Sequence, residues 1–339
     1  MRQLLYTGPK AVGLTDAAVP APGAGQVLVD VAYTGICGTD LHIYHGDMDA
    51  RVRPPATIGH EMSGRIGAVG PGTSEWAVGD PVTVMPLQWC GTCPACRAGH
   101  QTICQNLVFI GIDAPGSMQQ SWVVPADTLI RLPDGLPLRT AALVEPAAVA
   151  VHDVRRASVA PGDPVVVVGG GPVGLLIAVT ARQAGGDVLL VEPNAYRRSV
   201  AAGLGFAVSD PATSDVTGTV EEWTRGAGAR VAFEVSGSAA GVDTAVSVLA
   251  VRGRLCLVAI HPVPRSVNLH RFFWRELTLV GARLYERADF EHAVELVVDG
   301  TVPADALITH VARLTDADTA FNTLDAGTGV MKVLIDCQA

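Results

Sequence analysis

The stretch that most constrains the fold of this chain is residues 165–168, four consecutive valines followed at once by glycines. A continuous β-branched run is typical of a strand buried on both faces, as in a parallel sheet. Gly169-x-Gly171-x-x-Gly174 follows the run and opens a helix-like segment, 173–184. This order of strand, glycine turn and helix is the context in which backbone amides hold a pyrophosphate; a purely structural turn is the alternative.

The sequence around this run alternates strand-like and helix-length segments, which is the order of a doubly wound parallel sheet, a Rossmann domain. Glu192 lies about 20 residues past the glycines, where a carboxylate accepts the adenosine ribose hydroxyls and favours NAD over NADP. Arg197 and Arg198 could bind a phosphate or form a solvated helix face. The further strand-like segments are 188–192, 231–235, 255–260 and 277–280. The predicted cofactor-binding residues are Gly169, Gly171, Pro172, Val173, Gly174, Glu192 and Arg197.

The first part of the chain has a different character. Short strand-like segments alternate with glycine and proline about every ten residues, with no useful run of helical period, which predicts a small β-barrel. Near the C-terminus, a helical stripe at 289–299 and a strand at 331–336 are expected to return to this barrel. The predicted class is therefore α/β. The predicted domains are the barrel-like domain at 1–146, the Rossmann domain at 147–285 and a C-terminal return to the barrel-like domain at 286–339.

Four cysteines form the strongest local motif, Cys90-x2-Cys93-x2-Cys96-x7-Cys104. Four thiols at these spacings let one loop, 90–104, surround a tetrahedral zinc ion, and such a closed site is structural because no coordination position stays open. An iron–sulfur cluster is the alternative. In the bacterial ferredoxin motif, however, three residues precede the last cysteine and a proline follows it, whereas here seven residues precede Cys104 and Gln105 follows it. The motif therefore predicts a structural zinc.

The charge pattern narrows the possible partners. The net charge is −9 and no Lys/Arg run is present, which argues against nucleic-acid or anionic-membrane binding. No uninterrupted apolar segment reaches membrane-spanning length and the N-terminus lacks a signal-peptide pattern, so a cytoplasmic protein that acts on small molecules is expected.

A second zinc site with an open position would need about three mixed ligands, and Cys37, His60, Glu61 and Glu145 can supply them. Each also has a structural interpretation: a buried thiol, a core imidazole, or a salt bridge at a domain edge. Their combination is what favours a metal site.

The segments GICGTDLH, GHE at 59–61, the four-cysteine loop, VEPAAVAVH and VVVVGGGPVG occur in the order found in zinc-dependent medium-chain alcohol dehydrogenases. The chain resembles this family over essentially its whole length. It is most similar to the sorbitol, butanediol and threonine dehydrogenase branch, which has Glu at the position of Glu145. The resemblance implies a GroES-like catalytic domain, a Rossmann NAD domain and two zinc ions per chain.

The resemblance also implies roles for single residues. Cys37 and His60 match catalytic zinc ligands, and either Glu61 or Glu145 would complete the set, directly or through water. Thr39 matches the hydroxyl that binds the substrate oxygen, and His42 the imidazole that passes the proton to solvent. The implied reaction transfers hydride between NAD and a secondary alcohol or ketone, such as a polyol, vicinal diol, sugar, aminocyclitol or amino alcohol, in a homodimer or homotetramer.

Two other functions remain open from the sequence. One is a non-catalytic dinucleotide-binding or redox-sensing protein of the same fold, whose mark would be lost zinc ligands. The other is a zinc-free NADPH quinone reductase, which would need neither Cys37 nor the cysteine loop.

Several residues receive no role in catalysis or metal binding. No role is assigned to Asp40, and Cys256 and Cys337 are expected to be buried thiols. The histidines outside the motifs are interpreted as surface or packing residues: His45, His100, His152, His261, His270, His292 and His310.

Overall fold

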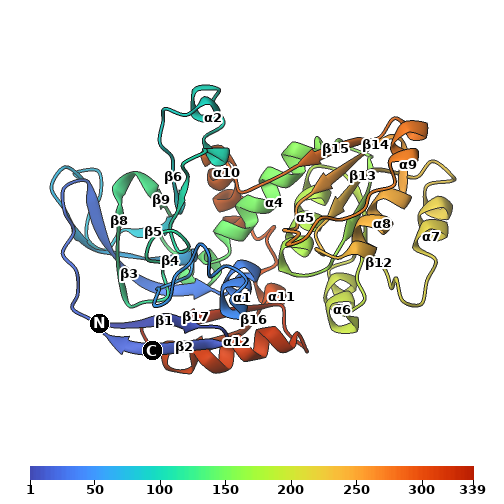
Figure 1. Cartoon of the computed structure of the whole chain (residues 1–339). Helices are drawn as coiled ribbons and strands as arrows, with labels where there is room; N and C mark the ends of the chain where they lie inside the picture. The colour runs from blue at the N-terminus through green and yellow to red at the C-terminus, as the bar shows by residue number, and fades with distance from the viewer. The chain divides into compact units, whose positions relative to one another are not determined.

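The computed structural model describes residues 1–339 and divides into two compact units (Figure 1). One unit consists of Met1–Glu145 together with Glu286–Ala339, and the other of Pro146–Tyr285. No helix is long and apolar enough to cross a membrane. Both units contain strands and helices, and the second unit has the parallel sheet that the sequence predicts.

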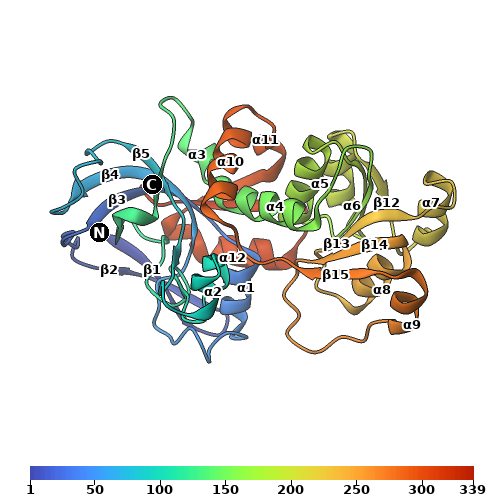
Figure 2. The ribbon, with the colours of Figure 1, turned by 90° about the horizontal axis from the view of Figure 1, so that it is seen from above.

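The second unit is built on a six-stranded parallel sheet in the order β12-β11-β10-β13-β14-β15. The valine run forms β10 at its centre, where these side chains are at most 4% exposed. Helices α5 and α6 cover one face and α8 the other (Figure 2). The strands are β10 (Pro164–Val168), β11 (Asp187–Val191), β12 (Ala207–Ser209), β13 (Ala229–Glu234), β14 (Leu249–Leu257) and β15 (Thr278–Gly281).

Helices connect these strands, and their ends follow local sequence signals. The Asn194 side chain accepts the Arg197 N–H at the start of α6, and Gly205 adopts a positive φ of 81° just past its end. The helices are α4 (Val144–Ala157), which starts in the first unit, α5 (Pro172–Gln183), α6 (Ala195–Gly203), α7 (Val216–Trp223), α8 (Ala239–Ser247) and α9 (Leu269–Arg275).

The first unit contains a seven-stranded sheet in which β16-β17-β3-β4-β5-β9 are neighbours and β8 also pairs with β3. The chain's last strand, β17, lies beside β3, so the C-terminal segment completes the sheet begun near the N-terminus (Figure 1). The sheet consists of β3 (Gln26–Gly35), β4 (Glu61–Val69), β5 (Pro81–Val84), β8 (Ser121–Pro125), β9 (Leu129–Arg131), β16 (Ile308–Arg313) and β17 (Lys332–Asp336).

Two smaller sheets and several helices surround this sheet. The expectation that the first region lacks helices of useful length was wrong, because α1 follows β3 directly. The missed signal is the Cys37-Gly38-Thr39-Asp40 start, in which Asp40 caps the helix. The remaining elements are β1 (Arg2–Gly8), β2 (Ala11–Asp16), β6 (Leu87–Gln88), β7 (Val108–Phe109), α1 (Gly38–His45), α2 (Pro94–Arg97), α3 (Leu138–Ala141), α10 (Arg287–Val298), α11 (Ala304–Leu307) and α12 (Ala317–Ala326), with short 3-10 helices at Gln101–Ile103, Ala126–Thr128 and Leu314–Asp316.

Candidate functional site

Cys37 lies between the end of β3 and the start of α1, as the N-cap residue of that helix. The carboxylate of Asp40 accepts the Cys37 N–H at 2.8 Å, and the Cys37 side chain faces the Asp40 N–H in return. This reciprocal capping holds the thiol at a fixed place above the strand. Residues within α1 therefore set the position of the sulfur relative to this helix.

His60 and Glu61 reach the same place from the start of β4, which pairs antiparallel with β3. Glu61 lies opposite Gly35, and a Cβ atom at Gly35 would collide with a Glu61 carboxylate oxygen, so a side chain there would displace the carboxylate. The ligand atoms of Cys37, His60 and Glu61 lie within 4.8 Å of one another. This donor set of sulfur, nitrogen and oxygen fits zinc.

Lys332, at the start of β17, approaches Glu61 from the other side of β3. Its ammonium nitrogen lies 2.7 and 2.6 Å from the two Glu61 oxygens and 3.2 Å from the Ile36 carbonyl oxygen. Burial alone would lower the pKa of Lys332, but the negative charges of Glu61, Cys37 and Glu145 outweigh it and raise the pKa. A buried cation, which sequence reasoning missed, therefore balances the acidic ligands.

Asp40 provides a second contact that sequence reasoning left without a role. Its Oδ1 lies 3.8 Å from His60 Nδ1, and both atoms are buried without a hydrogen-bond partner. Burial raises the pKa of Asp40, whereas the pKa of His60 rises because Asp40, Cys37 and Glu145 outweigh the opposing effect of burial. A carboxylate behind the imidazole is the usual arrangement for orienting a metal-binding histidine.

Glu145 is 4% exposed in the first turn of α4. Its charge raises the pKa values of both His60 and Lys332, so it lies near them. It is not part of the three-residue group whose ligand atoms lie within 4.8 Å. The structure thus brings Glu61 into that group and places Glu145 beside it.

Thr39 and His42 lie on α1 beside this group. The Thr39 hydroxyl oxygen is 3.8 Å from the Cys37 sulfur. The His42 side chain is 38% exposed, and its Nδ1 lies 3.2 Å from Asp47. One helix therefore carries a hydroxyl next to the half-buried Cys37 thiol and an imidazole in contact with solvent.

The four clustered cysteines have their sulfurs within 4.8 Å of one another, at the start of α2 and in the segments flanking it. Backbone N–H groups of Cys93, Cys96 and Asn106 point at these sulfurs at 3.3 to 3.5 Å. Donors from Thr92, Asn106 and Cys93 lower the pKa of Cys90 to about 5. Four sulfurs held this close together, with backbone N–H groups pointing at them, fit the closed zinc site.

The glycine turn of the second unit connects β10 to α5, with Gly171 as N-cap and Pro172 and Val173 as the first helical residues. A Cβ at Gly174 would collide with the carbonyl oxygen of Gly169, so helix and turn approach closely. At Gly171, by contrast, a Cβ would meet only the Arg197 guanidinium, at 3.7 Å. A Cβ at Gly171 meets no other protein atom within 4 Å, so the backbone at this helix N-terminus is open to a ligand such as a pyrophosphate.

Glu192 follows β11 and is 4% exposed. Its two oxygens accept the N–H groups of Gly170 at 2.6 Å and Asn194 at 2.7 Å. The neighbouring arginines differ: Arg198 binds the Glu192 carbonyl and Asp210, whereas the buried Nε of Arg197 has no partner. Arg197 is therefore the arginine available for a ligand at the turn.

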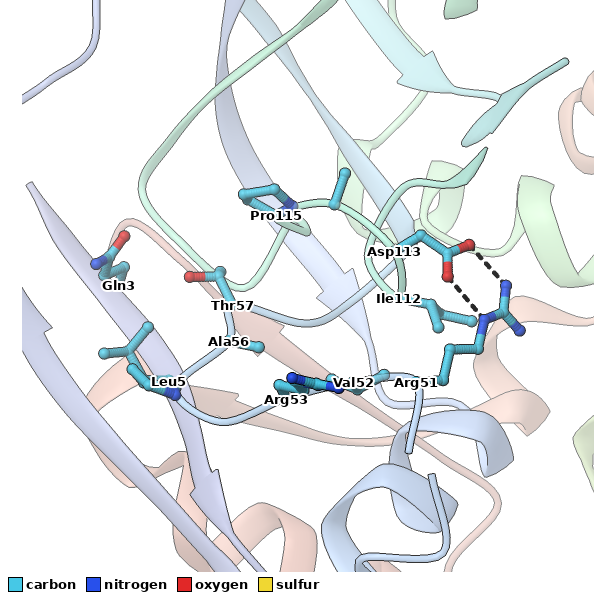
Figure 3. A pocket seen from close by; sticks show the side chains of 12 residues that line it. Gln3, Leu5, Arg51, Val52, Arg53, Ala56, Thr57, Ile112, Asp113 and Pro115 are labelled. Atoms are coloured by element: carbon cyan, nitrogen blue, oxygen red, sulfur yellow. Dashed lines mark hydrogen bonds and ion pairs between the residues drawn. The ribbon is translucent and has the colours of Figure 1, made fainter. Parts of the chain in front are cut away.

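A cavity of about 400 Å³ lies elsewhere in the first unit, between β1, residues 51–57 and residues 112–115 (Figure 3). Arg51 forms a two-pronged ion pair with Asp113 at its rim. Asp113 also accepts the Phe109 N–H, and the Phe109 ring lies 5.0 Å from the His60 ring. None of the candidate ligands lines this cavity, so it is separate from the metal group.

Comparisons with known proteins agree with this geometry. Residues 23–134 match the alcohol dehydrogenase GroES-like domain and residues 172–299 the zinc-binding dehydrogenase family. The chain is 47% identical, over 98% of both chains, to 2-dehydro-3-deoxy-L-galactonate 5-dehydrogenase of Pseudoalteromonas atlantica. It is 33% identical, over 99% of both, to sorbitol dehydrogenase of Halalkalibacterium halodurans. The structure of 2R,3R-butanediol dehydrogenase from Bacillus subtilis matches with a TM-score of 0.92, 30% identity and 99% of both chains covered.

Proposed function

The chain belongs to the zinc-dependent medium-chain alcohol dehydrogenase family, and from this premise we propose that its substrate is a polyhydroxy carboxylic acid. As a member of this family it is an NAD- and zinc-dependent oxidoreductase of secondary alcohols. The observation that carries the proposal is the 47% identity, over 98% of both chains, to a 2-dehydro-3-deoxy-L-galactonate 5-dehydrogenase. The proposed reaction oxidises the C5 hydroxyl of such an acid to a ketone.

Cys37 and His60 are proposed to hold the catalytic zinc with a carboxylate from Glu61 or Glu145, and the four cysteines the structural zinc. When bound, the zinc would supply a Lewis acid for the alcohol oxygen, and NAD a hydride acceptor. The Thr39 hydroxyl would accept the hydrogen bond of the substrate hydroxyl and, as it takes up that proton, pass its own proton on by way of the nicotinamide ribose to the exposed His42, which would release a proton to solvent. The alcohol thus loses one hydride and one proton.

Which carboxylate binds the catalytic zinc can be tested separately. Glu61 lies within the ligand group, but Lys332 already contacts both of its oxygens. Glu145 is outside that group, but its charge raises the pKa of His60. We expect Glu61→Gln and Glu145→Gln to lower the zinc content of the catalytic site to different degrees, and the variant that loses more zinc identifies the direct ligand.

The dinucleotide is proposed to bind along the glycine turn. The amides from Gly169 to Gly174, with Pro172 and Val173 opening α5, would face the pyrophosphate, and Arg197 would contribute a cation there. Glu192 would give up part of its hydrogen bonding to the Gly170 and Asn194 amides and would accept hydrogen bonds from the adenosine ribose hydroxyls instead. This arrangement favours NAD.

A substrate panel tests the proposed function. The purified enzyme would be assayed with NAD and, in turn, 2-dehydro-3-deoxy-L-galactonate, L-galactonate, sorbitol, L-threonine and 2,3-butanediol. We expect the sugar acids to give the highest kcat/KM. A preference for a neutral polyol would contradict the acid substrate while leaving the dehydrogenase class intact.

Self-association through the second unit is proposed to give a homodimer. Strand β15 forms an edge of the six-stranded sheet, and α9 beside it exposes apolar side chains: Leu269 at 74%, Phe273 at 76% and Trp274 at 67%. Two copies of such an edge pair across a two-fold axis and bury this surface. Leu279→Lys on β15 should shift the mass measured by light scattering from dimer to monomer; a native monomer would contradict the proposal.

A further inference from the structure

A buried carboxylate, Glu234, ends β13 at the carboxyl edge of the parallel sheet. The residue is 0% exposed. Its Oε1 accepts the Ser236 N–H at 2.9 Å, the Ser236 hydroxyl at 2.5 Å and the Gly237 N–H at 3.1 Å. Its Oε2 lies 2.9 Å from His261 Nε2. One side chain therefore joins the loop after β13 to the segment after β14.

Arg265 completes this arrangement. Because a carboxylate only accepts hydrogen bonds, His261 must carry its proton on Nε2, which leaves Nδ1 as the acceptor of a neutral ring. The Arg265 Nε–H points at that Nδ1 from 3.4 Å, and a second Arg265 nitrogen lies 3.4 Å from the Gly237 carbonyl oxygen. Each donor in the series from Arg265 through His261 to Glu234 therefore faces an acceptor.

The segment held in this way, residues 258–268, contains neither helix nor strand. Its backbone is anchored at its start, where the N–H groups of Val258 and Ala259 both reach the Glu234 carbonyl oxygen at 3.1 Å. Beyond that point, His261 and Arg265 tie its side chains back to the end of β13. A segment without regular structure depends on such contacts for a single conformation.

The location of these contacts points to the cofactor. Strands β10 and β13 are neighbours although β11 and β12 lie between them in sequence, so the dinucleotide crevice opens at their carboxyl ends. A Cβ at Gly169 would lie 2.9 Å from the Ser236 nitrogen, which places the loop after β13 against the glycine turn. Because the half that contains β10 to β12 carries Glu192 and serves the adenosine, the half from β13 onward faces the nicotinamide nucleotide.

We propose that Glu234, His261 and Arg265 are positioning residues that fix segment 258–268 and so shape the nicotinamide half of the NAD site. The proposal concerns the cofactor and holds for whichever alcohol is the substrate. It makes no use of the zinc ligands, which all belong to the other compact unit.

Binding of two ligands distinguishes a role in the nicotinamide half of the NAD site from a role in stabilising the whole sheet. NADH fills both halves of the site, whereas AMP fills only the adenosine half. We expect His261→Ala and Glu234→Gln to weaken NADH binding, measured by fluorescence titration, by about tenfold or more, since each breaks a charge-assisted hydrogen bond. AMP binding, measured by calorimetry, should stay within about twofold of the native value.

Matched controls isolate the effect. Glu276→Gln removes an exposed carboxylate of the same unit that pairs only with the exposed Arg252, and it should change neither affinity. His261→Gln keeps an amide N–H near the position of the imidazole Nε2 and should recover most of the NADH affinity lost in His261→Ala. In steady-state assays, KM for NAD should rise more than kcat falls.

Each outcome decides the proposal. Equal weakening of AMP and NADH would mean that the contacts only hold the sheet together, and unchanged NADH binding would mean that the segment needs no such anchor; either result overturns it. If Glu234→Gln fails to fold, Arg265→Ala, at the half-buried outer end of the chain of contacts, gives the same test with retained AMP binding as the folding check.

Discussion

The ammonium nitrogen of Lys332 lies 2.7 and 2.6 Å from the two carboxylate oxygens of Glu61, in a site where both residues are at most 2% exposed. The residues are separated by 271 positions in the chain and meet because β17 and β4 both pair with β3. The pair places a fixed positive charge behind the candidate zinc ligands. Its removal should therefore affect both the fold and the metal site.

Lys332→Met leaves the Glu61 carboxylate buried without its partner. Breaking one side of a buried ion pair costs about 3–5 kcal/mol, so we expect a loss of that size in the free energy of unfolding, measured by urea denaturation of the zinc-loaded protein. The double variant Lys332→Met/Glu61→Gln should recover a large part of the loss. An equal loss in single and double variants would show that Lys332 contributes through packing alone.

Substitution of single cysteines should separate the two metal sites. We expect two zinc ions per native chain by elemental mass spectrometry, one after Cys37→Ser and one after Cys93→Ser. Only Cys37→Ser should abolish activity while leaving the unfolding temperature nearly native, because the structural site remains closed around its metal. A native chain with one zinc would contradict the two-site assignment.

Asp40→Asn should test the carboxylate behind His60. Loss of such an orienting group typically lowers metal affinity or activity by about 10–100-fold, and we expect that range in kcat/KM or in the zinc dissociation constant. Asp305→Asn, at a fully exposed carboxylate on α11, is the matched control. If the two variants had the same kcat/KM and the same zinc dissociation constant, Asp40 would not be the group that orients His60.

Glu192→Ser should change the choice of cofactor. Loss of the carboxylate removes the repulsion of a 2′-phosphate and the acceptor for the ribose hydroxyls, so KM for NAD should rise and the NADP reaction should become measurable. The ratio of kcat/KM for the two cofactors is the measurement. An unchanged ratio would mean that Glu192 serves only the amides of Gly170 and Asn194.

The buried thiol of Cys256 should be unreactive at neutral pH. Burial, followed by the charge of Asp153, raises its pKa from 9.0 to about 12, so the thiolate is scarce in the folded protein. Because the unfolded thiol ionises near pH 9, this contribution to stability is present below that pH and is lost as the pH rises toward 12. Aromatic disulfide reagents at pH 8 should leave Cys256 unmodified until the protein unfolds, with Cys256→Ala as the reference for counting thiols.

The sequence alone determined much of the fold and the local parts of the site. The valine run predicted β10 because only a strand buried on both faces tolerates it, and the glycines after it predicted the turn into α5. The cysteine spacing predicted a cluster because all four sulfurs belong to one short loop. Such features depend on neighbours within about a dozen residues, so periodicity and spacing reveal them.

Only the tertiary structure decided which distant groups complete the site. Asp40 behind His60, Lys332 against Glu61, and His261 with Arg265 against Glu234 have no signal of their own, because their partners come from other strands and the register of the sheets sets every distance. A lone Lys or His in a sequence fits a solvated surface equally well. The contacts with buried carboxylates, which only the folded chain provides, are what make these residues candidates for roles at the metal and cofactor sites.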